Sequence, residues 1–366
     1  MPTGIEAEVW CRKVGPAAEW YAAAGVPVSI DPGIPNITAL PRLSRNLHAF
    51  SSFAFAWRKG RIFRRKLLEE ICRFDAIHLN HEGLFFLARW LRRRSEIPIS
   101  MHVRNFLPVN TFSRWQYRTA ARHVDAMVFI TENEERRVRE LVGRRVEGHV
   151  IYNVSAPRRR QRVENECANS TFCVGVLANY DWVRGIDRLV DVAAELKRRG
   201  RDDIRFLFAG DMTLRGRLPG KLGAIARQGG SLADYAAACG VAAQCEFLGH
   251  VSDPNLVLDR AHLLAKPTRE DNPWGRDIIE ALGAGLPVLS VGAYDHFVET
   301  DVTGVLMPRF TVATCANSIE ALADDPDKVQ SMGEKGAARV AQLCDGPARA
   351  KDLADVWRMM TSKSAK

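Results

Sequence analysis

The chain has 366 residues, of which 46% are hydrophobic and 26% charged, and this length accommodates two domains of ordinary size, each with its own core. The net charge of +9 belongs to residues 1–156, where 24 Lys and Arg stand against 15 Asp and Glu, whereas the rest of the chain carries 28 of each. No stretch approaches the ~20 apolar residues that span a bilayer, no signal peptide opens the chain, and the eight cysteines include no Cys-x-x-Cys pair, which argues against a metal site.

Short apolar runs alternate with amphipathic helical patterns in the first half of the chain. We predict strands at 6–11, 26–30, 74–80, 97–103, 126–131 and 150–153, and helices at 16–24, 83–94 and 132–142. This alternation is typical of a parallel sheet with helices on its faces. We therefore predict a Rossmann-like first domain over residues 1–156.

The same alternation returns in the second half. We predict strands at 171–178, 204–210, 245–250 and 261–265, and helices at 185–196 and 277–283. The polar, unperiodic stretch 157–170 is interpreted as a linker, so the second domain covers residues 171–345. Past Thr311 the chain is predicted to be helical, and residues 346–366 contain a terminal amphipathic helix.

Residues 267–287, Pro-Thr-Arg-Glu-Asp-Asn-Pro-Trp-Gly-Arg-Asp-Ile-Ile-Glu-Ala-Leu-Gly-Ala-Gly-Leu-Pro, bring an acidic loop and a helix start directly after a buried strand. In open α/β sheets ligands bind at the carboxyl ends of strands, where helix N-termini attract phosphates. Glu280, expected in the first helical turn, could accept two hydrogen bonds from a ribose diol. Glu270, Asp271 and Asn272 could take hydroxyl groups of a sugar. The alternative is an ordinary surface loop before an acidic first turn.

This arrangement resembles the donor site of family-4 glycosyltransferases, which are retaining enzymes of the GT-B fold. Pro267-Thr268, Glu280-Ala281 and the Gly-Leu-Pro-Val run 285–288 match the family pattern closely. The position seven residues before Glu280, where the family has a glutamate, holds Asn272. Either an insertion lets Glu270 or Asp271 serve, or Asn272 replaces the carboxylate.

The resemblance implies two Rossmann-like domains facing across a cleft and a set of site residues. Arg184-Gly185 stands where the family has the Lys-Gly that contacts the donor diphosphate, and arginine keeps that charge. A strand-end histidine near the sugar-transfer site corresponds to His102. The implied catalytic group is His102, Glu270, Asp271 and Asn272, and the implied donor-binding group is Glu280, Arg184, Gly275, Trp274, Arg276 and Gly185. No metal and no cofactor are implied beyond the UDP- or GDP-sugar donor substrate.

The start of the chain departs from the family pattern. Family members begin with a strand, a glycine-rich loop and a long helix, whereas residues 6–11 here resemble their second strand. The first domain is therefore expected to lack its first strand. Either the chain begins downstream of the true start, or this version is a weak or silent scaffold.

Cations and aromatic residues are interleaved at 57–66 and 89–94. Such a surface suits the anionic inner leaflet of a membrane, although a solvated helix face or a nucleic-acid site would have similar charge. We expect a cytoplasmic protein, peripheral on the inner membrane where these segments bind it. The function implied is transfer of a sugar to a glycan or lipid-linked acceptor of a surface polysaccharide. The alternatives are a silent GT-B scaffold and a basic protein that binds nucleic acid or anionic surfaces.

Overall fold

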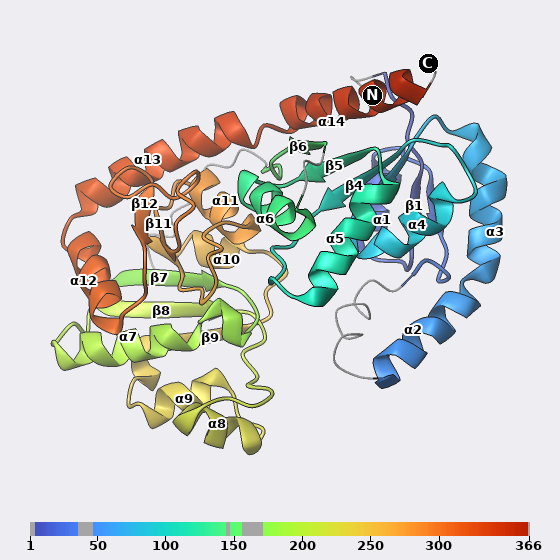
Figure 1. Cartoon of the computed structure of the whole chain (residues 1–366). Coiled ribbons are helices and arrows are strands. Elements are labelled where there is room, and N and C mark those ends of the chain that lie inside the picture. The colour runs from blue at the N-terminus through green and yellow to red at the C-terminus, as the bar shows by residue number, and fades with distance from the viewer. Residues whose placement is uncertain (1–3, 36–46, 144–146, 156–170, 365–366) are drawn as a thin grey trace. The chain divides into compact units, whose positions relative to one another are not determined.

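The computed structural model describes residues 4–35, 47–143, 147–155 and 171–364. The chain divides into two compact units (Figure 1). The N-terminal unit comprises residues 1–153 and 347–366, and the C-terminal unit comprises residues 154–346. Each unit is an α/β domain with parallel strands, as the sequence predicts.

The N-terminal unit contains two parallel sheets. The strands β1 (Val9–Cys11) and β2 (Val28–Ile30) pair with each other, with α1 (Pro16–Ala23) between them in sequence. The larger sheet has the order β3-β4-β5-β6 and consists of β3 (Ile77–Leu79), β4 (Ile99–Val103), β5 (Ala126–Phe129) and β6 (Gly148–Val150). Among the described residues β1 is the first strand, and its position is the one predicted from the sequence.

Helices cover both faces of this larger sheet. One face carries Met101 and Phe129 and packs against most of the helices of the unit. These are α2 (Leu47–Lys59), α3 (Arg61–Glu70), α4 (Phe85–Arg92), α5 (Thr111–His123) and α6 (Glu132–Val142), with the short turns η2 (Ile71–Arg73) and η3 (Glu82–Leu84). Because alternate residues of a strand point to opposite faces, the other face carries Ser100, Ala126 and Val128.

The last helix, α14 (Gly346–Ser364), returns to the N-terminal unit and covers that other face (Figure 1). Val356 and Met360 pack against Ala126 and Val128. The indole of Trp357 donates a hydrogen bond of 3.1 Å to Ser100 Oγ. A segment more than two hundred residues away in the sequence thus completes the core of the first domain.

The C-terminal unit has one six-stranded parallel sheet of the order β9-β8-β7-β10-β11-β12. Its strands are β7 (Phe172–Leu177), β8 (Ile204–Ala209), β9 (Cys245–Gly249), β10 (Leu263–Lys266), β11 (Val288–Val291) and β12 (Gly304–Met307). The chain runs outward from β7 in one direction, returns, and continues from β10 in the other. The adjacent strands β7 and β10 therefore form a topological switch point, and in open α/β sheets ligands bind outside the carboxyl ends of the strands at such a point.

Helices of the C-terminal unit lie on both sheet faces. The larger core includes Leu189, Leu232 and Ile319 from three of these helices, and Val257 packs on the opposite face. The helices and short turns are η4 (Trp182–Arg184), α7 (Asp187–Arg198), α8 (Gly220–Arg227), α9 (Leu232–Ala238), η5 (Ala242–Gln244), α10 (Asn255–Leu258), α11 (Arg276–Gly283), α12 (Val312–Ala323) and α13 (Pro326–Leu343).

Most predicted elements form within a few residues of their expected bounds, with two corrections. The last strand of the first domain, β6, is Gly148–Val150 and not 150–153, because its pairing partner β5 ends at Phe129. Glu280 lies in the second turn of α11, not the first, because that helix begins at Arg276. Of the predicted linker 157–170, all residues lie outside the described part of the chain.

Candidate functional site

The segments that follow β7 and β10 meet at the switch point of the C-terminal sheet. Gly185, which ends the short turn η4, has a φ of 68° and lies against the segment after β10. A Cβ atom at this position would be 2.1 Å from the carbonyl oxygen of Pro267. Only glycine allows this approach, so the sequence pair Arg184-Gly185 is held beside Pro267-Thr268.

Hydrogen bonds fasten the two segments at the same point. The carbonyl of Val183 accepts from the backbone N–H of Arg269 at 2.7 Å and from the hydroxyl of Thr268 at 3.2 Å. From the first turn of α7, the guanidinium of Arg188 donates to the carbonyls of Pro267 and Thr268 at 3.1 and 2.9 Å. Burial, and secondly the positive charge of Arg269, lower the pKa of Arg188.

Arg184 stays on the surface of this joint. Its side chain is exposed and, within the described part of the chain, it forms no ion pair. An exposed guanidinium at the switch point can donate hydrogen bonds to an anion such as a phosphate. The predicted phosphate cation is therefore next to the predicted acidic loop in the fold.

The N-terminus of α11 is built around Gly275 and a lysine. Gly275 has a φ of 148°, and a Cβ there would be 2.6 Å from Asp277 Oδ1 and 2.8 Å from Lys266 Nζ. Lys266, the last residue of β10, donates to the carbonyl of Trp274 at 2.5 Å and to Asp277 at 3.2 Å. The lysine thus holds the glycine turn at the start of α11, and a helix N-terminus favours negative charge.

Glu280 and Arg276 form an ion pair on α11. Arg276 Nη2 lies 2.7 Å from Glu280 Oε1, and the side chains are 74% and 25% exposed. An exposed i,i+4 pair contributes only about 0.3–0.5 kcal/mol. A ribose diol with two hydrogen bonds to the carboxylate could therefore displace the arginine.

The three polar residues that compete for the sugar have different environments. Asp271 accepts a hydrogen bond of 2.7 Å from the backbone N–H of Ala293 and so fixes the loop after β11. Asn272 has a buried Oδ1, and Trp274 a buried Nε1, that find no hydrogen-bond partner among the described residues. Glu270 has an exposed side chain, and its backbone N–H donates to Thr268 Oγ1 at 3.2 Å. The carboxylate of Asp271 is thus hydrogen-bonded to the backbone of the loop after β11.

His102 lies within strand β4 of the N-terminal unit and faces the side covered by α14. Its side chain is only 7% exposed, and its ring packs edge-on against that of His78 at 5.5 Å between centroids. The Nδ1 atom of His78 is 2.8 Å from Ser100 Oγ, which also accepts from Trp357. Burial, and secondly the charge of Arg104, lower the pKa of His102 to about 2 and that of His78 to about 4. Both rings are neutral at pH 7.

A second polar group lies at the carboxyl ends of β3 and β4. The buried carboxylate of Glu82 accepts from the backbone N–H of Arg104 at 2.9 Å and from the amide of Asn105 at 2.5 Å. The same amide lies 3.1 Å from His81 Nε2. Burial also raises the pKa of the neighbouring carboxyl of Glu134 to about 8. His81 and Asn105 are the more exposed members at this edge.

The structure brings Arg184, Gly185 and the acidic loop together in one unit, and leaves His102 in the core of the other. Sequence reasoning missed three structural supports, namely Lys266, Asp187 and Glu82. Lys266 ends the strand β10, Asp187 begins the helix α7, and Glu82 begins the short turn η3. Polar residues at the ends of predicted elements are the signal by which they could have been found. Among the described residues no three His, Cys, Asp or Glu side chains gather so as to hold a metal ion.

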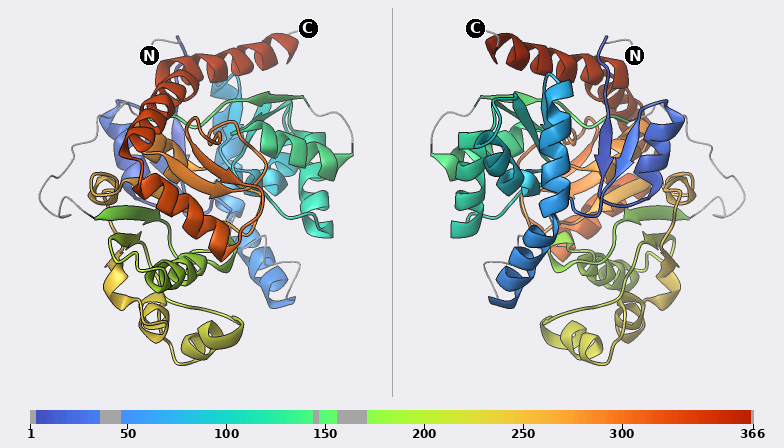
Figure 2. Two further views of the ribbon diagram at one scale, coloured as in Figure 1. Left: turned by 90° about the vertical axis from the view of Figure 1, so that its left-hand side faces the viewer. Right: turned by 90° about the vertical axis from the view of Figure 1, so that its right-hand side faces the viewer.

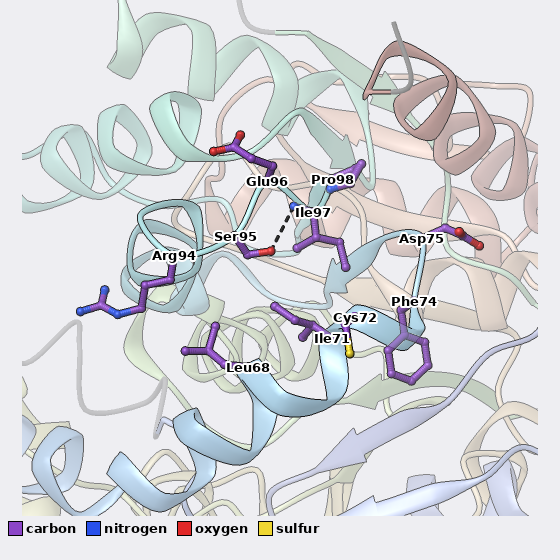
Figure 3. Close-up of a pocket in the computed structure, with 10 residues that line it drawn as sticks. All are labelled: Leu68, Ile71, Cys72, Phe74, Asp75, Arg94, Ser95, Glu96, Ile97 and Pro98. Atoms are coloured by element: carbon purple, nitrogen blue, oxygen red, sulfur yellow. Dashed lines mark hydrogen bonds between the residues drawn. The ribbon is translucent and has the colours of Figure 1, made fainter.

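A cavity of about 430 Å³ lies elsewhere in the N-terminal unit (Figure 3). Its walls include Leu68, Cys72, Phe74, Arg94 and Pro98. Phe74 and Pro98 precede strands β3 and β4, so the cavity is at the amino ends of the strands. It is therefore distinct from the carboxyl edge that carries the polar groups described above.

A doubly wound parallel sheet with a topological switch point is typical of nucleotide-binding domains. Residues 157–339 match the family model described as Glycosyl transferases group 1, and residues 2–154 match the model described as Glycosyl transferase 4-like domain. The chain belongs to the group 1 glycosyl transferases.

Individual relatives agree with this assignment. The alpha-D-kanosaminyltransferase of Streptomyces kanamyceticus is 25% identical over 344 residues, which cover 86% of this chain and 85% of that protein. The crystal structure of Anabaena Alr3699/HepE in complex with UDP-glucose superposes with a TM-score of 0.73 at 19% identity, covering 96% of this chain and 91% of that one. Sucrose-phosphate synthase from Thermosynechococcus elongatus gives a TM-score of 0.66 at 18% identity, with 82% and 80% covered. The fold is that of the GT-B glycosyltransferases, as the sequence predicts.

The buried histidines predict a pH-dependent stability of the N-terminal unit. The folded-state pKa of His78, about 4, lies below the ordinary 6.5, so between these values the unfolded chain binds a proton that the folded chain does not. Stability is therefore full above pH 6.5 and falls as the pH falls. Urea unfolding at pH 7 and pH 5 should show a loss of about 2 kcal/mol per neutral imidazole.

A glutamine at position 78 should flatten this dependence, because it stays neutral at every pH. The matched control is His250→Gln, since His250 is exposed in the C-terminal unit and lies outside the buried histidine pair. Equal pH slopes for His78→Gln and the native chain would contradict the burial argument.

The close contact at Gly185 predicts that alanine at this position lowers the free energy of unfolding. Gly185→Ala adds a Cβ in a left-handed conformation and against the Pro267 carbonyl, so we expect urea unfolding to show a loss of about 2–4 kcal/mol. Gly200→Ala is the control, because Gly200 has a φ of 80° but open space around it, and should cost about 1 kcal/mol. A loss at Gly185 no larger than that at Gly200 would show that the close approach is absent.

Proposed function

We propose that this glycosyltransferase is a retaining enzyme that uses a UDP- or GDP-sugar and transfers the sugar to a glycan or lipid-linked acceptor of a cell-surface polysaccharide. The observation that carries the proposal is the meeting of Arg184 and Gly185 with the loop 267–272 at the switch point of the C-terminal sheet. The UDP-glucose in the structure of Anabaena Alr3699/HepE, which has a similar fold, supports a nucleoside-diphosphate donor.

Each part of the donor has a group of suitable chemistry in the C-terminal unit. Glu280 would accept hydrogen bonds from the ribose diol, which would displace Arg276 from its carboxylate. The N–H of Gly275 and the guanidinium of Arg184 would hold the diphosphate, since both offer donors to an anion. Glu270 is our choice among the three polar candidates for the sugar, because it is an exposed carboxylate, whereas Asn272 carries no charge and the carboxylate of Asp271 fixes the loop after β11.

The catalytic effect would be mainly electrostatic. In a retaining transfer the leaving diphosphate can take the proton of the acceptor hydroxyl, so no separate general base is needed. Arg184 and the start of α11 would stabilise the negative charge that grows on this leaving group. Glu270 would stabilise positive charge that develops on the sugar.

The N-terminal unit would supply the acceptor side. We assign His102 a place behind Arg104 on the acceptor side: because its neutral ring is buried, it would act through Arg104, whose Nη2 lies 3.5 Å from His102 Nδ1. The exposed His81 and Asn105 at the same carboxyl edge could hydrogen-bond an acceptor hydroxyl. The neutral imidazole of His102 suits a place behind Arg104 because it can donate or accept a hydrogen bond without changing the charge of the site.

A membrane is the partner favoured by the surface of the N-terminal unit. Figures 1 and 2 show α2 extending from α3 away from the sheet β3–β6. Phe55 and Ile62 are 62% and 82% exposed. The cations of segments 57–66 and 89–94 that are exposed are Arg58, Lys59, Arg61, Arg65, Lys66, Arg93 and Arg94. Residues 47–68 contain no Asp or Glu to balance them.

Two of the predicted cations are engaged within the fold. Arg64 is buried with its guanidinium 4.0 Å from the ring of Trp57 and 5.6 Å from that of Trp90, and Arg92 pairs with Asp125. Arg64 thereby contacts an aromatic ring of each basic segment from within the fold. Among the described residues, no helix combines the length and the apolar character needed to cross a membrane. We propose that the enzyme acts at the cytoplasmic face of the inner membrane, bound by this surface.

Calorimetric titration with UDP, GDP and their sugars tests the donor site. We expect at least one of them to bind, and Glu280→Ala to weaken that binding by about 10-fold to 100-fold because two hydroxyl hydrogen bonds to a carboxylate are lost. Glu135→Ala is the control, since Glu135 pairs with Arg139 on a helix of the N-terminal unit as Glu280 pairs with Arg276.

The absence of binding to any of these compounds would refute the donor site. Binding without transfer to any acceptor would favour a silent scaffold over an enzyme.

Flotation with vesicles of phosphatidylglycerol and phosphatidylcholine tests the membrane surface. Phe55→Ser combined with Ile62→Ser should lower partitioning to the anionic vesicles by about tenfold or more, because two apolar side chains no longer enter the interface. Leu256→Ser is the control, as Leu256 is also exposed but lies in the C-terminal unit. Unchanged partitioning of the double variant, or tighter binding to DNA than to vesicles, would contradict the membrane assignment.

A further inference from the structure

The guanidinium of Arg269 lies between the two segments of the proposed donor site and contacts both. It forms a two-bonded ion pair with Asp187, with Nη1 to Oδ1 at 2.8 Å and Nη2 to Oδ2 at 2.5 Å. Asp187 is the first residue of α7 and is 4% exposed. Arg269 belongs to the acidic loop after β10, so the pair connects that loop to the helix that follows η4.

The same guanidinium also holds the turn that carries Arg184. Nη1 donates to the carbonyl of Trp182 at 2.6 Å, and the guanidinium stacks on the indole of Trp182 at 3.4 Å from the ring centroid. Trp182 is the first residue of η4 and is two positions from Arg184. One side chain thus bonds the beginning of the turn, the beginning of α7 and the acidic loop.

We infer that Arg269 and Asp187 are positioning residues for the donor, which set the position of Arg184 relative to Glu270. This inference rests on the proposed function. A planar guanidinium with a paired carboxylate fixes both distance and orientation, whereas a lysine fixes neither. Because the pair is nearly buried, it is also less screened by solvent than the exposed ion pairs of this chain. Neither residue needs to touch the donor to act in this way.

The alternative is that the pair only stabilises the fold. Stability and positioning make different predictions for the phosphate cation. If Arg269 positions Arg184, then removing Arg184 should matter less once Arg269 is altered, because Arg184 is already misplaced. If the pair only stabilises the fold, the two changes should act independently.

A double-mutant cycle between Arg184→Ala and Arg269→Lys separates these outcomes, with calorimetric titration of UDP and GDP as the measurement. In the native background we expect Arg184→Ala to weaken binding of the better nucleotide by about tenfold. In the Arg269→Lys background we expect a further loss below about threefold. A tenfold loss in both backgrounds would overturn the inference.

Two further variants keep the result clear. Arg201→Lys alters a two-bonded pair with Asp203 that lies at the amino end of β8, and in that background Arg184→Ala should again cost about tenfold. Asp187→Asn should repeat the behaviour of Arg269→Lys, and replaces it if Arg269→Lys fails to fold by circular dichroism. If the native chain binds neither UDP nor GDP, the proposed donor site itself fails. If the native chain binds and the cycle is additive, only the positioning role fails.

Discussion

The approach of the turn η4 to the segment after β10 is the constraint on which the C-terminal unit depends. It needs a residue without a Cβ at position 185, because the carbonyl of Pro267 occupies the space where a side chain would begin. Arg188 then satisfies the carbonyls of Pro267 and Thr268, and Arg269 adds a second donor to the carbonyl of Trp182. The result is a closely packed joint at the switch point of the sheet, with Arg184 exposed on its surface.

Cations have different tasks in the two units. The C-terminal unit has no excess of cations, and Lys266, Arg188 and Arg269 hold loops at the carboxyl edge of the sheet. In the N-terminal unit exposed cations gather on the helices α2 and α3, and residues 47–68 contain no carboxylate to pair with them. The first use gives precise local geometry, and the second gives long-range attraction to an anionic partner.

Several titratable side chains near the carboxyl edge of the N-terminal sheet are uncharged at pH 7. Burial keeps the rings of His78 and His102 neutral and raises the pKa of Glu134 above neutrality, so these groups require no counter-ion. Glu82 keeps its place by accepting hydrogen bonds from Arg104 and Asn105. The helix α14 closes over the histidine side of the sheet, which makes the end of the chain part of the first domain.

Hydrophobic periodicity and turn residues are local signals, so the sequence was enough to predict the two α/β domains, most of their strands and the acidic loop with its helix. It also identified Arg184-Gly185 as a partner of that loop through resemblance to a family. It did not predict the strands β11 and β12 or the helices α2, α3 and α5. Tertiary structure decided what no local pattern encodes. It buried His102, engaged Asp271 with the backbone of Ala293, moved Glu280 to the second turn of α11, and used Arg269 and Lys266 as internal supports. Burial and hydrogen-bond partners depend on segments distant in the sequence, so they follow only from the folded chain.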